Sequence, residues 1–254
     1  MSIYATGLLW VGGAAIVAGL VAYLIRRLGA TQGAVENNEA AGQVFTLVGG
    51  LQAVLVAFVL ISLFDGASAA EDGSYTEADS VVAAAWASES LSGEADRAAI
   101  VAQARDYTET VIDEEWPRMR EGQEVGDQGW NELSELRRLV AAAPAEDEWA
   151  IDQKNEASQQ LWEAYKARQE RLNTATGGGV NSVVWFAMVA GAVMSLALPL
   201  LFGGPRPLTH ILIVSTLAAT MTLLLYATHQ LQNPYSGGAE IGPAAFVSAL
   251  ERLQ

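Results

Sequence analysis

The chain of 254 residues contains no cysteine and only two histidines. The missing cysteines exclude disulfides, thiolate metal sites and a cysteine nucleophile. His210 and His229 stand near opposite ends of one apolar run, so they cannot hold one metal ion together. The sequence also lacks a Ser-His-Asp set, a metal-binding repeat and a nucleotide-binding glycine motif. We therefore expect no cofactor and no metal, and these absences argue against an enzyme.

Charged residues are missing from four long apolar runs. The runs are about 18–23 residues long, and roughly 20 helical residues cross the hydrocarbon core of a bilayer. A water-soluble domain of this size could not bury four such helices, so we expect an all-α, polytopic membrane protein. The runs are Leu8–Ile25, Val44–Leu63, Val180–Phe202 and Leu208–Ala227.

The runs form two pairs, separated by an acidic segment. Asp65–Gly179 holds 25 acidic and 10 basic residues, a difference equal to the net charge of −15 of the whole chain. An acidic domain is a poor partner for nucleic acid. We predict four parts: a transmembrane hairpin over 1–64, an acidic helical extramembrane domain over 65–179, a second hairpin over 180–231, and a C-terminal turn with a short helix over 232–254.

Four crossings of the bilayer place both termini and the acidic domain on one side. Basic residues near the membrane are about equally frequent in the loops opposite the domain and on the domain's own side. The positive-inside rule therefore leaves the orientation open. As an expectation we place the protein in the cell membrane with the domain on the cytoplasmic side.

Helical periodicity runs through the acidic segment. Pro117 should end or kink a helix near Trp116, because proline has no N–H to donate and clashes with the preceding turn. Ser92 is a candidate N-cap, and Thr174–Gly179 is expected to be a flexible joint. The predicted helices are Thr76–Leu91, Glu94–Glu121, Trp130–Ala143 and Glu148–Asn173. The expected inward face of the last helix is Trp149, Ala157, Leu161, Tyr165 and Leu172.

The second apolar run is the most informative one for function. One stripe of it, at helical spacing, consists of Leu51, Val54, Phe58 and Ile61. The stripe either packs against other helices or lines a pore, where apolar side chains form a hydrophobic gate. Gly49 and Gly50 would allow close approach between helices. The polar members Gln52 and Ser62 could line water or form hydrogen bonds between helices.

Glu114 and Glu115 precede Trp116 and Pro117 in a compact block. Paired carboxylates can perform acid–base chemistry, but adjacent helical residues point about 100° apart and do not face each other. We therefore expect a helix end with a buried tryptophan, whose acids are solvated or paired with the nearby Arg118 and Arg120.

Short motifs in a fixed order give the chain a family resemblance. They are Glu77-Ala78, Tyr107 followed by Glu115-Trp116-Pro117, Arg168 with Arg171-Leu172, and Asn233-Pro234-Tyr235-Ser236-Gly237. Together with the two-plus-two helix layout and the glycine- and phenylalanine-rich second helix, they resemble the bestrophin-like membrane proteins of prokaryotes. The resemblance covers nearly the whole chain.

The resemblance extends more distantly to true bestrophins, which are ring-shaped anion channels, typically pentamers. Their second helix lines a pore with a hydrophobic neck. The likeness implies a bilayer-embedded homo-oligomer, with a pentamer favoured, that conducts inorganic, chloride-like anions. Val54 and Phe58 fall where neck residues are expected, and the stripe adds Leu51 and Ile61.

Two departures from bestrophins bear on function. Phe64-Asp65-Gly66-Ala67 replaces an Arg-Trp-Trp-type block, and only Glu240 closely follows the Asn-Pro motif, where bestrophins have an acidic calcium-binding cluster. We do not expect calcium gating. A ring of −15 domains would also repel anions if it lined the vestibule. A cation-selective channel stays open as an alternative, as does a non-conducting scaffold or sensor whose acidic domain binds a partner or cations.

Overall fold

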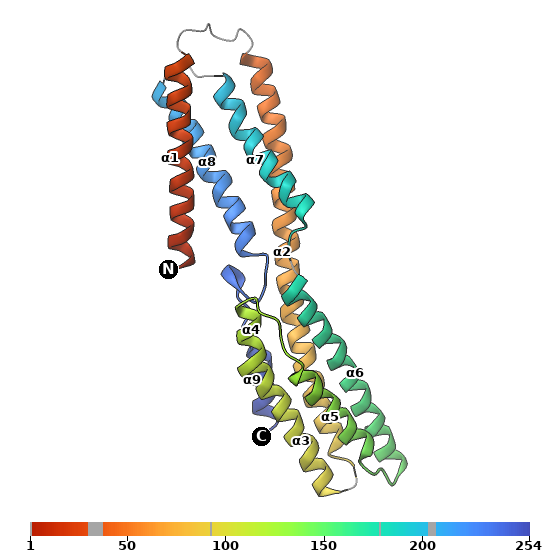
Figure 1. The fold of residues 1–254 in the computed structure, drawn as a ribbon. Coiled ribbons are helices and arrows are strands. Elements are labelled where there is room, and N and C mark those ends of the chain that lie inside the picture. The colour runs from red at the N-terminus through yellow and green to blue at the C-terminus, as the bar shows by residue number, and fades with distance from the viewer. Residues whose placement is uncertain (1, 30–37, 92, 178, 203–206) are drawn as a thin grey trace. The chain divides into compact units, whose positions relative to one another are not determined.

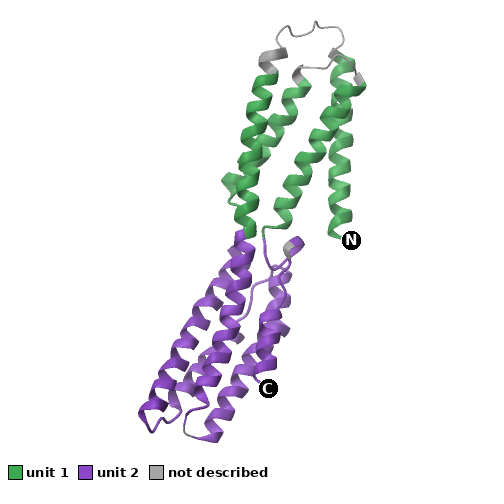
Figure 2. Ribbon diagram, turned by 180° about the vertical axis from the view of Figure 1, so that it is seen from behind, with its two compact units in different colours: residues 1–64, 179–232 green, residues 65–178, 233–254 purple. Residues whose placement is uncertain are grey.

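The computed structural model describes residues 2–29, 38–91, 93–177, 179–202 and 207–254, and every regular element within these ranges is helical (Figure 1). This confirms the predicted all-α class. The chain divides into two compact units (Figure 2). Unit 1 is residues 1–64 with 179–232, and unit 2 is residues 65–178 with 233–254. The candidate cap Ser92 lies outside the described residues.

Unit 1 is built from apolar helices. They are α1 (Ile3–Gly29), the first part of α2 (Asn38–Ser88), α7 (Ser182–Phe202) and α8 (Pro207–Gln230). Each is long and apolar enough to cross a membrane. These helices confirm the four predicted membrane spans.

Helix α1 packs along α8 through small residues. A Cβ atom at Gly7 would come within 2.8 Å of the Tyr226 ring, and one at Gly19 within 2.6 Å of the Ser215 hydroxyl. The Tyr226 hydroxyl donates a hydrogen bond to the carbonyl of Ile3 at 2.7 Å. Glycine permits this backbone approach, as is common where membrane helices meet.

Helix α2 continues without a break from unit 1 to Ser88 in unit 2. The sequence predicted a separate helix beginning at Thr76, so the structure corrects this boundary. A single glycine inside a helix costs only about 1 kcal/mol relative to alanine. Gly66 and Gly73 therefore weaken the helix without ending it.

Unit 2 packs the rest of α2 with shorter helices. They are α3 (Glu94–Thr110), η1 (Val111–Glu115), α4 (Trp116–Arg120), α5 (Gln128–Ala142), α6 (Glu148–Gly177), the 3-10 turn η2 (Gly237–Ala239) and α9 (Ala244–Arg252). Leu133, Leu136 and Val140 recur at helical spacing on α5 and are buried in the core. Phe246 and Leu253 of the C-terminal segment are buried in the same core.

The expected single helix Glu94–Glu121 is divided by a π-helical turn. Helix α3 ends at Thr110, η1 follows, and α4 begins at Trp116 with Pro117 in its first turn. Helical structure runs through Trp116 and Pro117 to Arg120, so Pro117 does not end the helix, and the change near Trp116 is the one from η1 to α4. The interruption is a widened turn of the kind that often marks functional sites in helices.

Helix α6 differs from its predicted inward face at two positions. Ala157 and Leu161 are buried, but Trp149 is 63% and Tyr165 is 42% exposed. Arg168 and Arg171 are buried instead. The helix also continues to Gly177, through most of the segment predicted to be a flexible joint.

Candidate functional site

The four predicted neck residues lie on an exposed face of α2 in unit 1. Leu51, Val54, Phe58 and Ile61 are 65%, 54%, 68% and 56% exposed. The opposite face of the helix is buried, with Val56 and Val59 in a cluster with Met188 of α7. The stripe therefore has no intramolecular packing role comparable to that of the buried face, and its pore-lining role stays a prediction.

Gln52 belongs to the buried face of α2. Its amide nitrogen donates a 2.9 Å hydrogen bond to the carbonyl of Met188, and the residue is only 4% exposed. A Cβ added at Gly191 of α7 would come within 2.8 Å of the Gln52 amide carbon. A Cβ added at Gly49 or at Gly50 would meet nothing within 4 Å. Gln52 is therefore an interhelical hydrogen-bonding residue, which corrects its place among the polar pore-lining candidates.

Ser62 is the other polar candidate on this helix. Its side chain is exposed, and it follows Ile61 directly on α2. It remains a candidate for contact with water.

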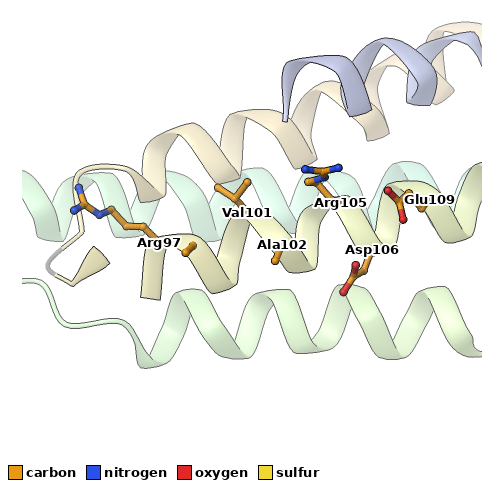
Figure 3. A pocket seen from close by; sticks show the side chains of 7 residues that line it. Arg97, Val101, Ala102, Arg105, Asp106 and Glu109 are labelled. Atoms are coloured by element: carbon orange, nitrogen blue, oxygen red, sulfur yellow. The ribbon is translucent and has the colours of Figure 1, made fainter. Parts of the chain in front are cut away.

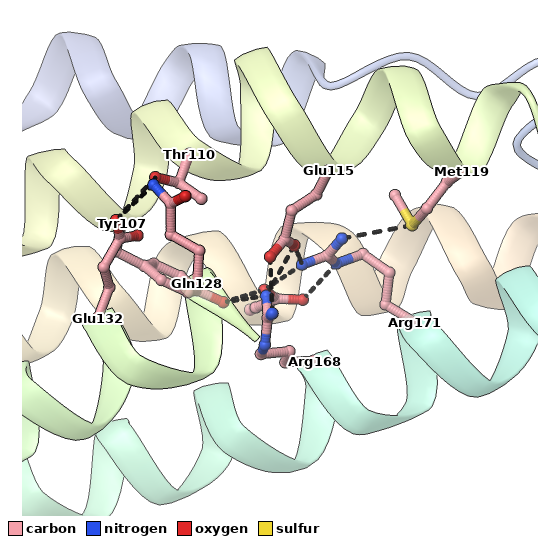
Figure 4. A network of polar contacts seen from close by, with 9 residues as sticks. Tyr107, Thr110, Glu115, Met119, Gln128, Glu132, Arg168 and Arg171 are labelled. Carbon is pink, nitrogen blue, oxygen red and sulfur yellow. Dashed lines mark hydrogen bonds and ion pairs between the residues drawn. The ribbon is translucent and has the colours of Figure 1, made fainter. Parts of the chain in front are cut away.

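A buried cluster of charged residues forms the polar centre of unit 2 (Figure 4). Its side chains come from four elements: Glu77 of α2, Tyr107 of α3, Glu115 of η1, and Arg168 and Arg171 of α6. Every one of these residues is no more than 3% exposed. The two carboxylates and two guanidinium groups balance in charge, as burial of ions requires.

Glu115 joins the two arginines. Arg168 donates two hydrogen bonds to it, with Nη1 to Oε2 at 2.7 Å and Nη2 to Oε1 at 2.6 Å. Arg171 reaches the same carboxylate with Nη2 at 2.9 Å. Bidentate arginine–carboxylate pairs fix the relative orientation of the two side chains, and they are stronger than hydrogen bonds between neutral groups.

Glu77 forms the other bidentate pair, with Arg171. Arg171 donates to it from Nε at 2.7 Å and from Nη2 at 2.9 Å. The Tyr107 hydroxyl donates a short hydrogen bond to the same carboxylate. The cluster therefore ties α2, α3, η1 and α6 together in one continuous network.

The network sets the protonation states of its members. Burial alone would raise the pKa of the Glu115 carboxyl, but the hydrogen bonds and charges of Arg168 and Arg171 outweigh burial and lower it. Burial, together with the charge of Glu77, raises the pKa of Tyr107 well above its ordinary value. At neutral pH the carboxylate is ionised and the phenol donates its proton, which is the arrangement that the hydrogen bonds require.

Aromatic rings enclose both guanidinium groups. The Arg168 guanidinium lies 4.5 Å from the Trp130 ring centre, and that of Arg171 lies 5.6 Å from Trp116 and 5.4 Å from Phe246. Such contacts stabilise a cation most when water is excluded.

The Asn-Pro-Tyr segment packs beside this cluster. The Tyr235 ring meets Trp116 edge-on, with ring centres 5.5 Å apart. The Asn233 side chain accepts a bond from the Tyr235 amide at 2.9 Å, and the carbonyl of Pro234 accepts one from Ile241 at 2.9 Å. The Trp116 indole donates to the Ile241 carbonyl at 3.0 Å. The motifs that carried the family resemblance thus meet in one place.

The structure corrects the expected partners of Glu115. It binds Arg168 and Arg171 and is buried, while Glu114 is exposed. The burial of Arg168 and Arg171 could have been inferred from the sequence. The two arginines continue the buried register of α6, which contains Ala157, Leu161, Ala164, Arg168 and Arg171 at alternating steps of four and three residues.

Gly129→Ala is expected to destabilise unit 2. A Cβ at Gly129 would lie 2.7 Å from Nη2 of Arg168 and would also overlap the Glu115 carboxylate. Forcing the buried ion pair aside should cost about 1–3 kcal/mol, as overpacking does. Unfolding of the full chain in detergent micelles measures the loss. Gly126→Ala is the matched control, because nothing lies within 4 Å of its added Cβ. Equal effects of the two variants would contradict the expected clash.

The outer face of α3 carries an open hollow with charges of both signs. Figure 3 shows Arg97, Arg105, Asp106 and Glu109 along this one helix. Every residue that lines this hollow belongs to α3. The described residues also contain no group of three His, Cys, Asp or Glu placed to hold a metal ion. We assign no ligand to this hollow.

Comparison with known proteins gives a family and a fold. The sequence model of the Bestrophin-like domain matches residues 12–246. No curated protein sequence matches the chain.

Two solved structures resemble the whole chain. One is a bacterial bestrophin homologue from Klebsiella pneumoniae that carries a point mutation, with 13% identity and a TM-score of 0.70, covering 100% of this chain and 98% of that one. The other is the crystal structure of a membrane protein, with 12% identity, a TM-score of 0.70 and the same coverage. Identities this low show the fold alone. The family match spans nearly all of the chain, so this multi-pass membrane protein belongs to the Bestrophin-like family.

Proposed function

We propose that the protein is an oligomeric ion channel with a passive pore lined by α2. The observation that carries this proposal is the exposed apolar stripe Leu51, Val54, Phe58 and Ile61, which lies opposite the face packed on α7. A stripe of this kind can close a pore by excluding water, without any charged group in the membrane. Family membership supports the same function.

A ring of copies is part of the proposal, because a single chain encloses no pore with one exposed helix face. We favour a pentamer, which the likeness to bestrophins implies. In such a ring the α2 stripes would face a common axis, and the ring of Phe58 side chains would form its narrowest apolar constriction.

The charge along α2 favours cations over anions. This helix contains no Lys or Arg. In unit 2 it carries Asp65, Asp72 and Asp79, which are exposed and follow one another at seven-residue spacing, so they share a helix face. Asp65 also follows Phe58 by seven residues. Rings of carboxylates select cations in channels, so we propose cation selectivity in place of the chloride-like conductance that the resemblance implies.

Ionic current from purified protein in a planar bilayer, under a salt gradient, tests the proposal. A reversal potential near the cation equilibrium value would support the α2 carboxylates as part of the path. A reversal near the chloride value would keep the pore and exclude these carboxylates from selectivity. No current from protein shown to be folded and oligomeric would favour a non-conducting scaffold or sensor.

Neutralising Asp65 and Asp72 together, as Asp65→Asn with Asp72→Asn, should shift the reversal potential toward the chloride value. The reason is the loss of two carboxylates per subunit from the proposed path. Asp79 is left intact because it pairs with Arg252. Glu71→Gln is the control, since Glu71 is exposed but lies about 100° around the helix from Asp72. An equal shift in the control would indicate a general surface-charge effect.

The cytoplasmic location of unit 2 stays a prediction. The natural absence of cysteine makes accessibility labelling clean. A Ser158→Cys variant in intact cells should resist a membrane-impermeant maleimide until the cells are opened. Labelling before opening would place unit 2 outside the cytoplasm.

A further inference from the structure

A groove lies on the surface of unit 2 between α5 and α6. Its volume is about 480 Å³, which is in the range of sites that hold small organic molecules. Both helices contribute to its lining. Leu133 of α5 and Leu161 of α6 are the buried apolar part of that lining, at 4% and 2% exposed. The groove is therefore a junction of two packed helices and remains open to water.

Aromatic side chains form one end of this groove. Trp162 is 55% and Tyr165 is 42% exposed, and their rings stack with centres 5.2 Å apart and planes 6° apart. Tyr165 also packs against Trp130, whose ring centre lies 4.5 Å from the Arg168 guanidinium. The row of rings is thus held by the buried charged cluster. Its outermost ring, that of Trp162, is accessible to a flat ligand.

Arg137 lies farther along the same groove. Helices α5 and α6 are antiparallel, because the row of rings joins them near one end and the Lys154 ammonium donates to the Ala141 carbonyl at 2.7 Å near the other. In this register the α6 residue opposite Arg137 stands four positions before Trp162. Arg137 is therefore displaced from Trp162 by about 6 Å along the groove.

The charge of the groove is positive, although the segment around it is acidic. Arg137 is exposed and forms no ion pair with any residue that the structure describes, whereas the adjacent Arg138 is paired with Glu135. Lys154 adds a second positive charge near the same end. Among the described residues, no acidic side chain lines the groove. An anionic ligand is favoured, because arginine binds a carboxylate through charge-assisted hydrogen bonds.

We propose that this groove binds a small aromatic carboxylate, a flat ring with a short acidic arm. The ring stacks on the exposed face of Trp162, and the carboxylate accepts hydrogen bonds from the Arg137 guanidinium. The Ser134 hydroxyl lines the groove between these two side chains and donates a further hydrogen bond to the carboxylate. The site belongs to unit 2 alone, so its binding does not depend on ion conduction.

Fluorine NMR of 4-fluorophenylacetate, titrated into the full chain in detergent micelles, tests the proposal. Protein-free micelles correct for partition of the probe into detergent. We expect saturable binding to the natural chain. Affinity should fall about tenfold in Arg137→Gln, which loses a charged donor, and about fivefold in Trp162→Ala, which loses the stacking surface. The neutral amide of the probe should bind about tenfold more weakly than the acid.

Two variants in the same helices are matched controls. Arg138→Gln changes the net charge by the same amount at a residue outside the groove lining. Trp149→Ala removes a tryptophan that is 63% exposed but lies about 140° around α6 from Trp162. Both variants should bind the probe as the natural chain does. Circular dichroism checks the helical fold of every variant.

The titrations can overturn the proposal in three ways. Absence of saturable binding to the natural chain would mean that the groove does not hold such a ligand. Equal affinity for the acid and its amide would show that no positive group recognises the carboxylate. Weakening by Arg138→Gln as large as that by Arg137→Gln, or undiminished binding to folded Trp162→Ala, would place the probe outside the groove.

Discussion

Phe58→Ala is expected to raise single-channel conductance severalfold. Phe58 is 68% exposed and is the largest side chain on the α2 stripe. If the stripe forms the proposed apolar gate, removing an aromatic ring from every subunit widens the constriction and lowers the cost of wetting it. Single-channel recording in planar bilayers measures the change at fixed voltage and salt concentration.

Phe64→Ala is the matched control for this experiment. Phe64 is 58% exposed on the same helix, but six residues of helix place it about 120° around the axis from Phe58. Its removal should leave conductance nearly unchanged. If both variants conduct like the natural channel, Phe58 is not the gate. If both increase conductance equally, the effect is a general loosening of α2.

Arg171→Ala should destabilise the fold by about 3–5 kcal/mol, the cost of removing one partner from a buried ion pair. The substitution removes the bidentate partner of Glu77 and one of the hydrogen bonds that Glu115 accepts. The enclosing rings of Trp116 and Phe246 also lose their cation. Chemical unfolding of the full chain in micelles, followed by circular dichroism, gives the free energy of unfolding.

Two comparisons distinguish the buried cluster from ordinary surface charge. Arg138→Ala removes an exposed ion pair with Glu135 and should change stability little, because such pairs are screened by water. Arg171→Met combined with Glu77→Gln removes both charges of one pair and should lose less stability than Arg171→Ala alone. A loss from Arg171→Ala no larger than that from Arg138→Ala would contradict the role assigned to the cluster.

The register of α6 predicts one part of this cluster, the burial of its two arginines. Arg168 and Arg171 extend the same periodic face as Ala157 and Leu161, so their burial could be inferred from spacing alone. The partner of the two arginines, Glu115, could not be inferred in this way. Glu115 lies 53 and 56 residues away, and the sequence offered the nearer Arg118 and Arg120 instead. The π-helical turn contains both adjacent glutamates, and of the two only Glu115 is buried.

Local composition by itself determined the helical class and the four membrane spans, because runs of about 20 uncharged residues have few other stable environments. It also determined the concentration of negative charge in one segment. Tertiary structure alone decided that Gln52 binds the backbone of α7, that Glu115 joins two arginines, and that the Tyr235 ring packs edge-on against Trp116. The physical reason is that periodicity encodes which side of a helix avoids water, whereas the partner of a buried polar group depends on which helix faces meet.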